Sequence, residues 1–322
     1  MTKKNNILIC SAGKRVELVK SFLSAISDLK IDGEVFTTDV SPSLSAACHV
    51  SNKSFKVPKV TNKNYIEILL EICLKNKIKL VLPTIDDELE ILSKNKKTFA
   101  KNKIEVVISN KNFINYCRDK RKTGFLFESI DIKYPKILSK KKLVFPCFCK
   151  PFDGSSSDGA ILIFDKSELT SKIYSNKKNM FMAYINKEYK EYTIDIYFNK
   201  DGALCSLVPR ERLEVRSGEV NKGVTRKNYL YHFLLNRFVS LKGVVGCITA
   251  QVFFNSNTKD VIGLEINPRF GGGYPLSDSA GAKYSEWLLR EYFLNQKINF
   301  FDKWKENLLM LRYDAKVLIH EN

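Results

Sequence analysis

The chain has 322 residues, of which 44% are hydrophobic, so it is long enough for about two folded domains and is not a disordered polypeptide. Its formal net charge is +18, but the lysines are spread over the whole length, which favours a solvated surface and leaves polyanion binding as the minority interpretation. No apolar run approaches the roughly 20 residues of a membrane helix, and the early run Ile7–Cys10 is too short for a signal peptide, so we expect a cytoplasmic protein.

Short apolar runs and helical patterns alternate through the first third of the chain. Strands are predicted at 6–10, 34–38, 79–83 and 104–109. Helices are predicted where apolar residues recur three and four positions apart, at 16–26, 66–73 and 89–92. Strand–helix alternation of this kind predicts a parallel sheet covered by helices.

The middle of the chain combines a helix with a Gly/Ser-rich loop. A helix is predicted around Phe113–Ser129, followed by strands at Cys147–Pro151 and Ala160–Phe164. Lys150 lies at the end of the first strand, directly before the loop Gly154–Gly159. Such a loop can wrap phosphates with backbone N–H groups, although many ordinary hairpins have similar turns. It is not a Walker loop, because the lysine precedes the glycines.

Strands dominate the last part of the chain. Tyr192–Phe198 and Ala203–Val208 are joined by Asn199–Gly202, a sequence typical of a hairpin turn. Glu191 directly precedes the first of these strands and shares a face with Thr193 and Asp195. A carboxylate there can accept ribose hydroxyl groups, and a half-exposed strand explains the same pattern equally well.

A second predicted hairpin places oxygen-bearing side chains on one face. Ile248–Phe254 and Val261–Asn267 are two strands joined by a polar turn. If apolar face pairs with apolar face, the register that sets Phe254 opposite Ile262 also sets Gln251 opposite Glu265 and Thr249 opposite Asn267. Gln251, Glu265 and Asn267 then converge as ligands suited to Mg²⁺. The alternative is an exposed polar face of an edge hairpin.

Arginines and glycines lie on both sides of this hairpin in the sequence. Arg210 and Arg216 suit an anionic substrate, though they could equally be solvated. Arg269 follows the second strand directly, and Gly271–Gly273 permit close approach of the backbone to a ligand. The residues Gly13–Arg15 come at a strand-to-helix turn, where a helix N-terminus and basic side chains favour anions.

The cysteines and histidines do not form a recognisable metal site. Eight cysteines are scattered without a CxxC pair, and the three histidines are far apart in the sequence. We therefore expect reduced, mostly buried thiols.

Taken together, these segments resemble the ATP-grasp superfamily, in particular stand-alone relatives of the carbamoyl phosphate synthetase large subunit. The resemblance rests on Ser11–Arg15, Pro83–Leu89, Asp119–Lys120, Lys150–Gly159, Glu191–Asp195, Gln251 and Glu265–Arg269. It implies an α/β and α+β protein with the ATP-grasp fold. A Rossmann-like pre-ATP-grasp domain would cover residues 1–110, a lid subdomain 111–178, and the ATP-grasp core with its metal site 179–322.

The motifs and the resemblance together assign three groups of residues. The catalytic group is Arg269, Arg210 and Arg216. The group that would contact the phosphates, adenine and ribose of ATP is Lys120, Lys150, Gly154, Ser155, Ser156, Ser157, Gly159, Met182, Ala183, Tyr184, Ile185 and Glu191. The group that would bind Mg²⁺ or Mn²⁺ is Gln251, Glu265 and Asn267. The resemblance places the adenine hinge at Met180–Ile185. Its segment Met182–Ile185 departs from the family pattern, because relatives often carry Gln-Glu there.

The function that the resemblance implies is that of an ATP-dependent carboxylate–amine ligase. A carboxylate would become an acyl-phosphate and then be captured by an amine or ammonia, with release of ADP and phosphate. A single grasp unit without a glutaminase domain argues against complete carbamoyl phosphate synthesis. Two rivals remain open: a small-molecule kinase of the same fold, and a non-catalytic nucleotide- or polyanion-binding module. We expect a small anionic substrate and an amine as partners, no membrane and no nucleic acid, and leave a homodimer open.

Overall fold

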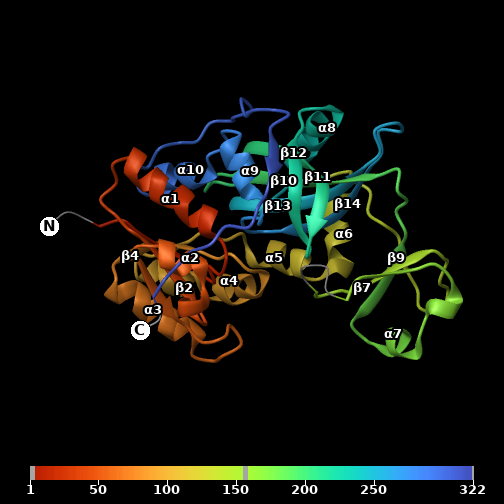
Figure 1. Ribbon diagram of the computed structural model, residues 1–322, viewed down its shortest axis with the longest axis horizontal. Coiled ribbons are helices and arrows are strands. Elements are labelled where there is room, and N and C mark those ends of the chain that lie inside the picture. Colours follow the sequence, from red (N-terminus) through yellow and green to blue (C-terminus); the bar gives the residue numbers. More distant parts are fainter. Residues whose placement is uncertain (1–3, 155–158, 321–322) are drawn as a thin grey trace.

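The computed structural model describes residues 4–154 and 159–320 and contains three β-sheets (Figure 1). Five strands form the sheet of an N-terminal domain, six form the sheet of a core, and four form a small sheet at one end of the molecule. In the described part of the chain, no helix has the length and apolar character needed to cross a membrane. All eight cysteines are buried and unpaired, as the sequence predicted.

The N-terminal domain is the predicted parallel sheet covered by helices. Its strands are β1 (Asn6–Ile9), β2 (Val35–Asp39), β3 (Lys53–Lys56), β4 (Ile78–Leu82) and β5 (Glu105–Val106). Its helices are α1 (Val16–Asp28), η1 (Pro42–Leu44), α2 (Ala46–Val50), α3 (Tyr65–Lys75) and α4 (Asp86–Lys101). The strand order is β3-β2-β1-β4-β5, so the order reverses between β1 and β4. Ligands of open α/β sheets bind at the carboxyl ends of the strands at such a reversal.

The core is built on a six-stranded sheet with the order β14-β13-β10-β11-β12-β15. Its strands are β10 (Lys190–Phe198), β11 (Leu204–Arg216), β12 (Glu219–Thr225), β13 (Gly246–Phe254), β14 (Val261–Asn267) and β15 (Leu309–Leu311). Its helices are α8 (Tyr229–Phe238), α9 (Tyr274–Ser279) and α10 (Tyr284–Tyr292). All pairings in this sheet are antiparallel. The predicted hairpin turn at Asn199–Gly202 joins β10 to β11, with Gly202 at φ +82°.

The hairpin of β13 and β14 contains a β-bulge that the sequence did not predict. Phe254 pairs with Val261, so the expected pairing of Phe254 with Ile262 was wrong. One extra residue, Leu264, lies between the partners of Val252 and Gln251. The bulge restores the predicted pair of Gln251 with Glu265, and Thr249 pairs with Asn267.

Two helices connect the N-terminal domain to the rest of the chain. The single helix expected around Phe113–Ser129 was wrong, because the chain forms α5 (Lys111–Arg118) and α6 (Lys120–Glu128). Asp119 separates them in an extended conformation, and its side chain accepts a hydrogen bond from the backbone N–H of Arg121 at 3.0 Å. Aspartate caps helix N-termini in this way, so the break has a local cause.

The small sheet projects from one end of the molecule (Figure 1). Its strands are β6 (Ile137–Leu138), β7 (Cys147–Pro151), β8 (Ile161–Ile163) and β9 (Asn179–Ala183), in the order β6-β9-β7-β8. The short helices η2 (Lys166–Glu168) and α7 (Ser171–Ser175) accompany it. Strand β9 follows the expected lid boundary at 178 in the sequence but pairs within this sheet. We refer to residues 137–183, as far as they are described, as the lid.

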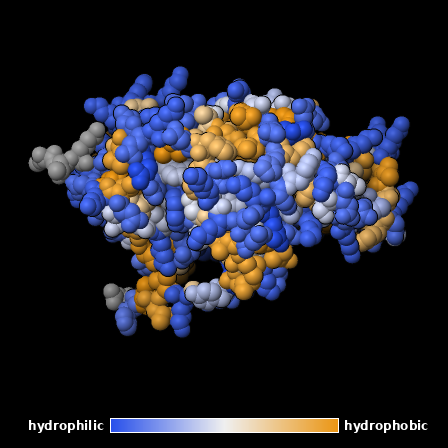
Figure 2. Space-filling model, turned by 90° about the horizontal axis from the view of Figure 1, so that it is seen from above, coloured by the Kyte–Doolittle hydropathy of each residue, from blue (hydrophilic) through white to orange (hydrophobic). Residues whose placement is uncertain are grey.

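The N-terminal domain and the core pack on each other through α1. The ring of Phe22 meets that of Phe270 at a centroid distance of 6.0 Å, and Ser21 hydrogen-bonds Ser285 at 2.6 Å. Buried residues of both units belong to one hydrophobic cluster. On the face shown in Figure 2, hydrophilic residues extend over the whole length of the molecule, in line with lysines spread along the chain.

Candidate functional site

One face of the core sheet carries a row of polar side chains from four neighbouring strands. Arg210, Thr193, Gln251 and Glu265 lie opposite one another across β11, β10, β13 and β14. Residues that pair directly across strands share a face of the sheet. The other face is apolar, with Ile194 and Ala250 fully buried. The alternation in the sequence thus gathers the polar groups on one side.

Gln251, Glu265 and Asn267 supply the oxygen atoms of the expected metal site. The Asn267 amide donates to Glu265 Oε1 at 2.9 Å, and the Lys120 ammonium lies 3.7 Å from Glu265 Oε2. In residues 4–154 and 159–320, no cluster of three His, Cys, Asp or Glu side chains could hold a metal by itself. One carboxylate and two amides fit a hard cation that takes its remaining ligands from water or a bound anion.

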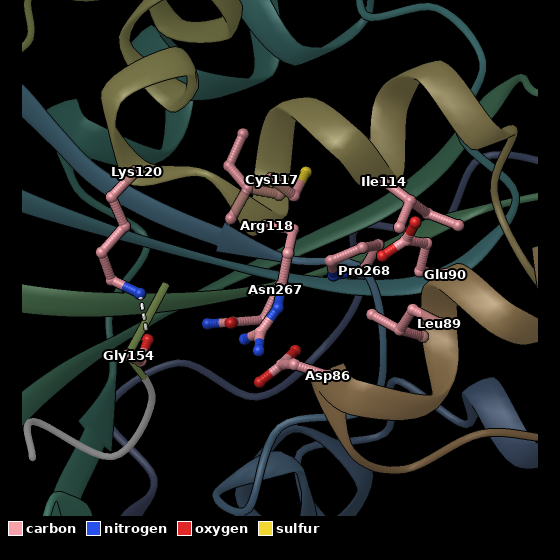
Figure 3. A pocket seen from close by; sticks show the side chains of 11 residues that line it. Asp86, Leu89, Glu90, Ile114, Cys117, Arg118, Lys120, Gly154, Asn267 and Pro268 are labelled. Carbon is pink, nitrogen blue, oxygen red and sulfur yellow. Dashed lines mark hydrogen bonds between the residues drawn. The ribbon is translucent and has the colours of Figure 1, made fainter. Parts of the chain in front are cut away.

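Two lysines from different segments approach this oxygen set. Lys120 begins α6, and its ammonium donates to the Gly154 carbonyl at 2.5 Å (Figure 3). Lys150 is the penultimate residue of β7 and is 7% exposed. Burial lowers the pKa of Lys150 to about 8. The negative charges of Glu265 and Glu191 oppose this shift, and the positive charge of Lys120 adds to it. Each of these groups is therefore close enough to act on the others.

The predicted phosphate loop, Gly154–Gly159, is described only at its two terminal glycines. Gly154 accepts the Lys120 bond, and Gly159 has φ +69°, a conformation that glycine adopts without strain. Ser155, Ser156 and Ser157 were also predicted to contact phosphate, and they lie outside the described residues.

Glu191 lies at the start of β10, next to an arginine that the sequence analysis did not single out. Arg212 Nε is 3.2 Å from Glu191 Oε1, and Arg212 also donates to Thr193 Oγ1 at 3.2 Å and to the Gly218 carbonyl at 3.1 Å. Burial raises the pKa of Glu191, and Glu265 raises it further, whereas Arg212 and Lys150 lower it. Glu191 thus belongs to the same charge cluster as the two lysines.

The segment predicted as a hinge leaves the small sheet at this point. Met182 is 1% exposed and pairs with Phe148 and Ile137 on neighbouring strands. Ala183 donates its backbone N–H to the Lys136 carbonyl at 2.8 Å. Tyr184 and Ile185 follow the strand and are half-buried, so they are the members of the predicted set that lie beyond the sheet.

Arg269 crosses from the core to the N-terminal domain. Its Nε and Nη2 donate to the two carboxylate oxygens of Asp86, at 2.9 and 2.7 Å, and its Nη1 donates to the Phe270 carbonyl at 3.2 Å. Arg15 reaches the same place and donates to the carbonyls of Phe270 at 3.2 Å and Thr84 at 2.9 Å. Burial lowers the pKa of Arg15 to about 10, and the charge of Arg269 contributes to the shift. The two guanidinium groups are therefore neighbours.

Arg210 forms a buried ion pair beneath the glycine loop. Its Nε and Nη2 donate to the carboxylate of Asp195 at 2.8 and 3.1 Å, and Ser277 donates to the same carboxylate at 2.6 Å. Arg210 is 1% exposed, and its Nη1 has no hydrogen-bond partner among the described residues. A Cβ added at Gly273 would come within 2.3 Å of that nitrogen, so only glycine fits there.

Arg216 stands apart from the other predicted catalytic residues. It ends β11, its side chain is 63% exposed, and it pairs with the exposed Asp314 at 2.5 Å. Within the described chain it makes no hydrogen bond to the groups around Glu265 or Arg269.

A pocket opens where the N-terminal domain meets the end of β14 (Figure 3). It is lined by Asp86, Leu89, Glu90, Ile114, Cys117, Arg118, Lys120, Gly154, Ile266, Asn267 and Pro268. Figure 3 shows Lys120, Asn267 and Asp86 around the same opening, contributed by α6, β14 and α4. The site is thus assembled from three parts of the chain.

Sequence reasoning gave no role to three residues that the structure places in this site. Asp86 lies in the quoted motif Pro83–Leu89, and Asp195 in the quoted motif Glu191–Asp195, but neither was assigned a partner. Arg212 lies two positions after Arg210 and so shares its strand face, which is the signal that could have identified it.

Comparisons with known proteins agree with this architecture. Residues 7–107 match the PylC-like N-terminal domain, and residues 117–273 match the ATP-grasp domain. Together the two matches cover most of the chain. No protein with a curated description matches the sequence significantly.

Solved structures show the same fold at low sequence identity. Biotin carboxylase from Campylobacter jejuni superposes with a TM-score of 0.73 at 14% identity, covering 95% of this chain and 74% of that one. N5-carboxyaminoimidazole synthetase from Staphylococcus aureus, complexed with ADP, gives 0.70 at 17%, covering 92% and 79%. L-amino acid ligase from Bacillus licheniformis gives 0.67 at 13%, covering 91% and 75%. With both domain matches and this shared architecture, the chain belongs to the ATP-grasp superfamily and carries a PylC-like N-terminal domain before its ATP-grasp domain.

Proposed function

We propose that the protein is an ATP-dependent ligase that activates a carboxylate as an acyl-phosphate and joins it to an amine or ammonia, releasing ADP and phosphate. One observation carries the proposal. The cations Lys120, Lys150 and Arg269 come from the connecting helix, the lid and the core, yet the charge of Glu265 acts on all three, and the Asn267 amide donates to the same carboxylate. Cations beside a metal-type oxygen set suit the triphosphate of ATP.

The nucleotide would lie between the lid and the core sheet. Lys120 and Lys150 would contact its phosphates, and Glu191 would accept hydrogen bonds from the ribose. Because the Ala183 N–H is already bonded to Lys136, the adenine would meet the backbone of Tyr184 and Ile185. This arrangement is supported by the charge cluster that joins Lys150, Glu191 and Glu265.

Gln251, Glu265 and Asn267 would hold Mg²⁺ or Mn²⁺. Their three oxygen-bearing side chains fit such a cation, and with only one formal negative charge among them they leave room for phosphate oxygens as further ligands. When bound, the metal would neutralise charge on the phosphate oxygens of ATP.

The chemistry needs no protein nucleophile. A carboxylate oxygen of the acid would attack the γ-phosphorus of ATP, and the bond to the bridging oxygen of ADP would break. The amine would then attack the acyl carbon, lose a proton to solvent or the departing phosphate, and expel phosphate. Arg269 would stabilise the charge on the transferred phosphoryl group and then on the tetrahedral oxygen. Closure of the lid would keep water away from the acyl-phosphate.

The acid is expected on the arginine side of the cleft. Direct contact of the acid with Arg210 remains a prediction, because the guanidinium is 1% exposed and ion-paired with Asp195; its Nη1, which has no partner among the described residues, lies next to Gly273. The contact of Arg216 with the acid stays a prediction, because Arg216 pairs with Asp314 at the surface. The Gly13–Arg15 turn would act indirectly, since Arg15 is bonded to backbone carbonyls and the Gly13 N–H to Asp39 at 3.0 Å.

The test is ADP release from Mg-ATP with a panel of amino acids and sugar acids, each with and without an amine or ammonia. We expect one class of acid to raise ADP release, and the amine to give an amide product in equal amount. Glu265→Gln serves as the inactive control. Phosphorylated acid as the final product would indicate a kinase, and ADP release that responds to no acid would contradict the ligase assignment.

A further inference from the structure

The acidic run that begins α4 sends its three carboxylates to three different places. Glu88 is fully buried and accepts hydrogen bonds from groups of the N-terminal domain alone. Asp87 is 65% exposed and pairs with Arg118 at 2.9 Å. Asp86 pairs with Arg269 across the junction with the core. The proposed function uses Arg269 but leaves the role of Asp86 open.

The geometry of the Asp86–Arg269 pair determines which N–H groups remain for a ligand. A guanidinium group carries five N–H donors. Asp86 takes one on Nε and one on Nη2, and the Phe270 carbonyl takes one on Nη1. Two donors remain, one on each terminal nitrogen, and a bidentate carboxylate fixes the plane in which they lie.

The position of the pair in the fold also favours a fixed orientation. Asp86 follows β4 at the point where the strand order of the N-terminal sheet reverses, next to the turn after β1 that carries Arg15. The two side chains are only 14% and 15% exposed. Arg15 adds a second bond from the same turn to Phe270, the residue after Arg269. The core segment is therefore held by the N-terminal domain at two adjacent points.

We propose that Asp86 is a positioning residue: it holds the Arg269 guanidinium side-on from the N-terminal domain, so that the two remaining N–H donors face the phosphoryl group in the cleft. The inference rests on the proposed function for its catalytic consequence, but the anchoring itself does not depend on turnover. It gives the N-terminal domain a direct part in the chemistry of the core, beyond binding substrate.

Replacing the carboxylate separates this role from simple packing. Asp86→Asn keeps the shape but leaves one acceptor oxygen and no charge, so the side-on pair is lost. Asp86→Glu keeps the two oxygens and the charge on a longer stem, so it should restore the pair in part. Asp87→Asn is the matched control, because it removes the adjacent carboxylate of the same helix turn. Asp87 is exposed and pairs with the partly exposed Arg118 and not with Arg269.

The experiment combines a resonance measurement with kinetics on the full-length protein. With ¹⁵N-labelled arginine, the Nε–H signal that disappears in Arg269→Ala should exchange slowly with solvent in the wild type and in Asp87→Asn. It should exchange at least tenfold faster in Asp86→Asn and recover in Asp86→Glu. With Mg-ATP and water as the acceptor, Asp86→Asn should lower kcat about 10²-fold with KM for ATP within about twofold, as expected for a misplaced catalytic group.

A double variant distinguishes positioning from an independent structural effect. If Asp86 acts through Arg269, Asp86→Asn in an Arg269→Ala background should cause no further loss of kcat. The proposal would be overturned if the losses of kcat in the two single variants multiplied in the double variant. It would also be overturned if Asp86→Asn left the Arg269 exchange rate unchanged, or if Asp87→Asn had the same effect as Asp86→Asn. Absence of ADP release from the wild type with every acid of the panel would count against the proposed function alone, and the exchange rates would still decide whether Asp86 holds Arg269.

Discussion

At the scale of single residues, Lys150 shows how the site prepares for a polyanion. Lys150 is only 7% exposed, so its ammonium group has lost most of its water, and this burial lowers its pKa to about 8. Glu265 and Glu191 compensate in part, while Lys120 adds like charge. An arriving phosphate would relieve both the desolvation and the repulsion between the lysines.

Mg-ATP binding should therefore depend on pH through Lys150. The charged form binds phosphate, so affinity should be full below about pH 8 and fall up to about tenfold per pH unit above it, because the free protein then releases the proton that binding must restore. Lys150→Met should bind more weakly at pH 7 and show a flat profile from pH 7.5 to 9.5. Calorimetry measures both; Lys142→Ala, which changes an exposed lysine of the lid, is the control. A wild-type profile that is flat across pH 8 would refute this role.

Glu265 and Arg269 should separate binding from chemistry. Glu265→Gln removes the only formal charge of the oxygen set, so metal-dependent nucleotide affinity and turnover should fall together. Arg269→Ala should keep most nucleotide affinity but lower ADP release about 10²–10³-fold, because it acts mainly in the transition state. Calorimetry, ADP release and Tm should be measured for each variant. Two folded and fully active variants would show that Glu265–Arg269 is a structural segment.

The residue-level site could be predicted where it depended on strand alternation. The pairing of Gln251 with Glu265 across β13 and β14 followed from the alternation of polar and apolar residues along these two strands. The Asp86–Arg269 pair could not be predicted in this way, since it joins positions 183 residues apart that only the docking of the two domains brings together. The pairing of Arg216 with Asp314 likewise joins two positions that the sequence pattern does not relate.

At the scale of elements, the bulge in β14 decides which side chains face the cleft. With the observed pairing of Val252 with Gly263, a regular ladder would set Leu264 opposite Gln251 and move Glu265 to the buried face. The extra residue prevents this. The sequence predicted the right pairs through a turn register that was wrong, because hydrophobic alternation constrains the face but does not reveal an inserted residue.

The break between α5 and α6 has a similar positional effect. Asp119 caps α6, and the next residue, Lys120, donates its backbone N–H to the Phe152 carbonyl of the lid at 2.9 Å. No proline or glycine stands at residues 118–121 to mark this break in the sequence, although an aspartate before a helix is a typical start signal.

Removing this cap should affect nucleotide binding as well as stability. Asp119→Ala should cost about 1 kcal/mol of stability and lower Tm by about 2–4 °C, and should weaken Mg-ATP binding because Lys120 is the first residue of the helix. Asn110→Ala removes the matching cap of α5, whose side chain accepts from the Phe113 N–H at 2.8 Å, and should destabilise similarly without changing ATP affinity. Thermal unfolding and calorimetry on both variants make the comparison. Equal losses of affinity would refute a specific effect on Lys120.

At the scale of the whole molecule, the lid differs from the other units in how it is stabilised. Its buried hydrophobic cluster contains Cys147, Cys149, Ile163 and Phe181, whereas one large cluster runs through the N-terminal domain and the core. Small clusters stabilise weakly, because buried apolar area provides the main favourable term. The parallel N-terminal sheet and the strand-rich core were predictable from their patterns, and so were the lid strands β7 and β8. The other two lid strands were not, since β6 has only two residues and residues 179–183 of β9 were expected to belong to the core.

The lid should therefore be the part of the molecule that responds most to nucleotide. Mg-ATP would join Lys150 of the lid to Glu265 and Asn267 of the core, so the amides of β7 and β9 should exchange hydrogen more slowly in its presence. Strands β10 and β13 are held by the large cluster and should change little. With ATP in excess EDTA the protection should disappear, because one carboxylate and two amides hold neither the metal nor the phosphates tightly alone. Hydrogen exchange followed by mass spectrometry tests this directly.

Two outcomes would contradict this prediction. Equal protection of β7 with and without the divalent metal would show that the oxygen set does not take part in nucleotide binding. Equal protection of lid and core would show that the two do not close on the ligand as separate units.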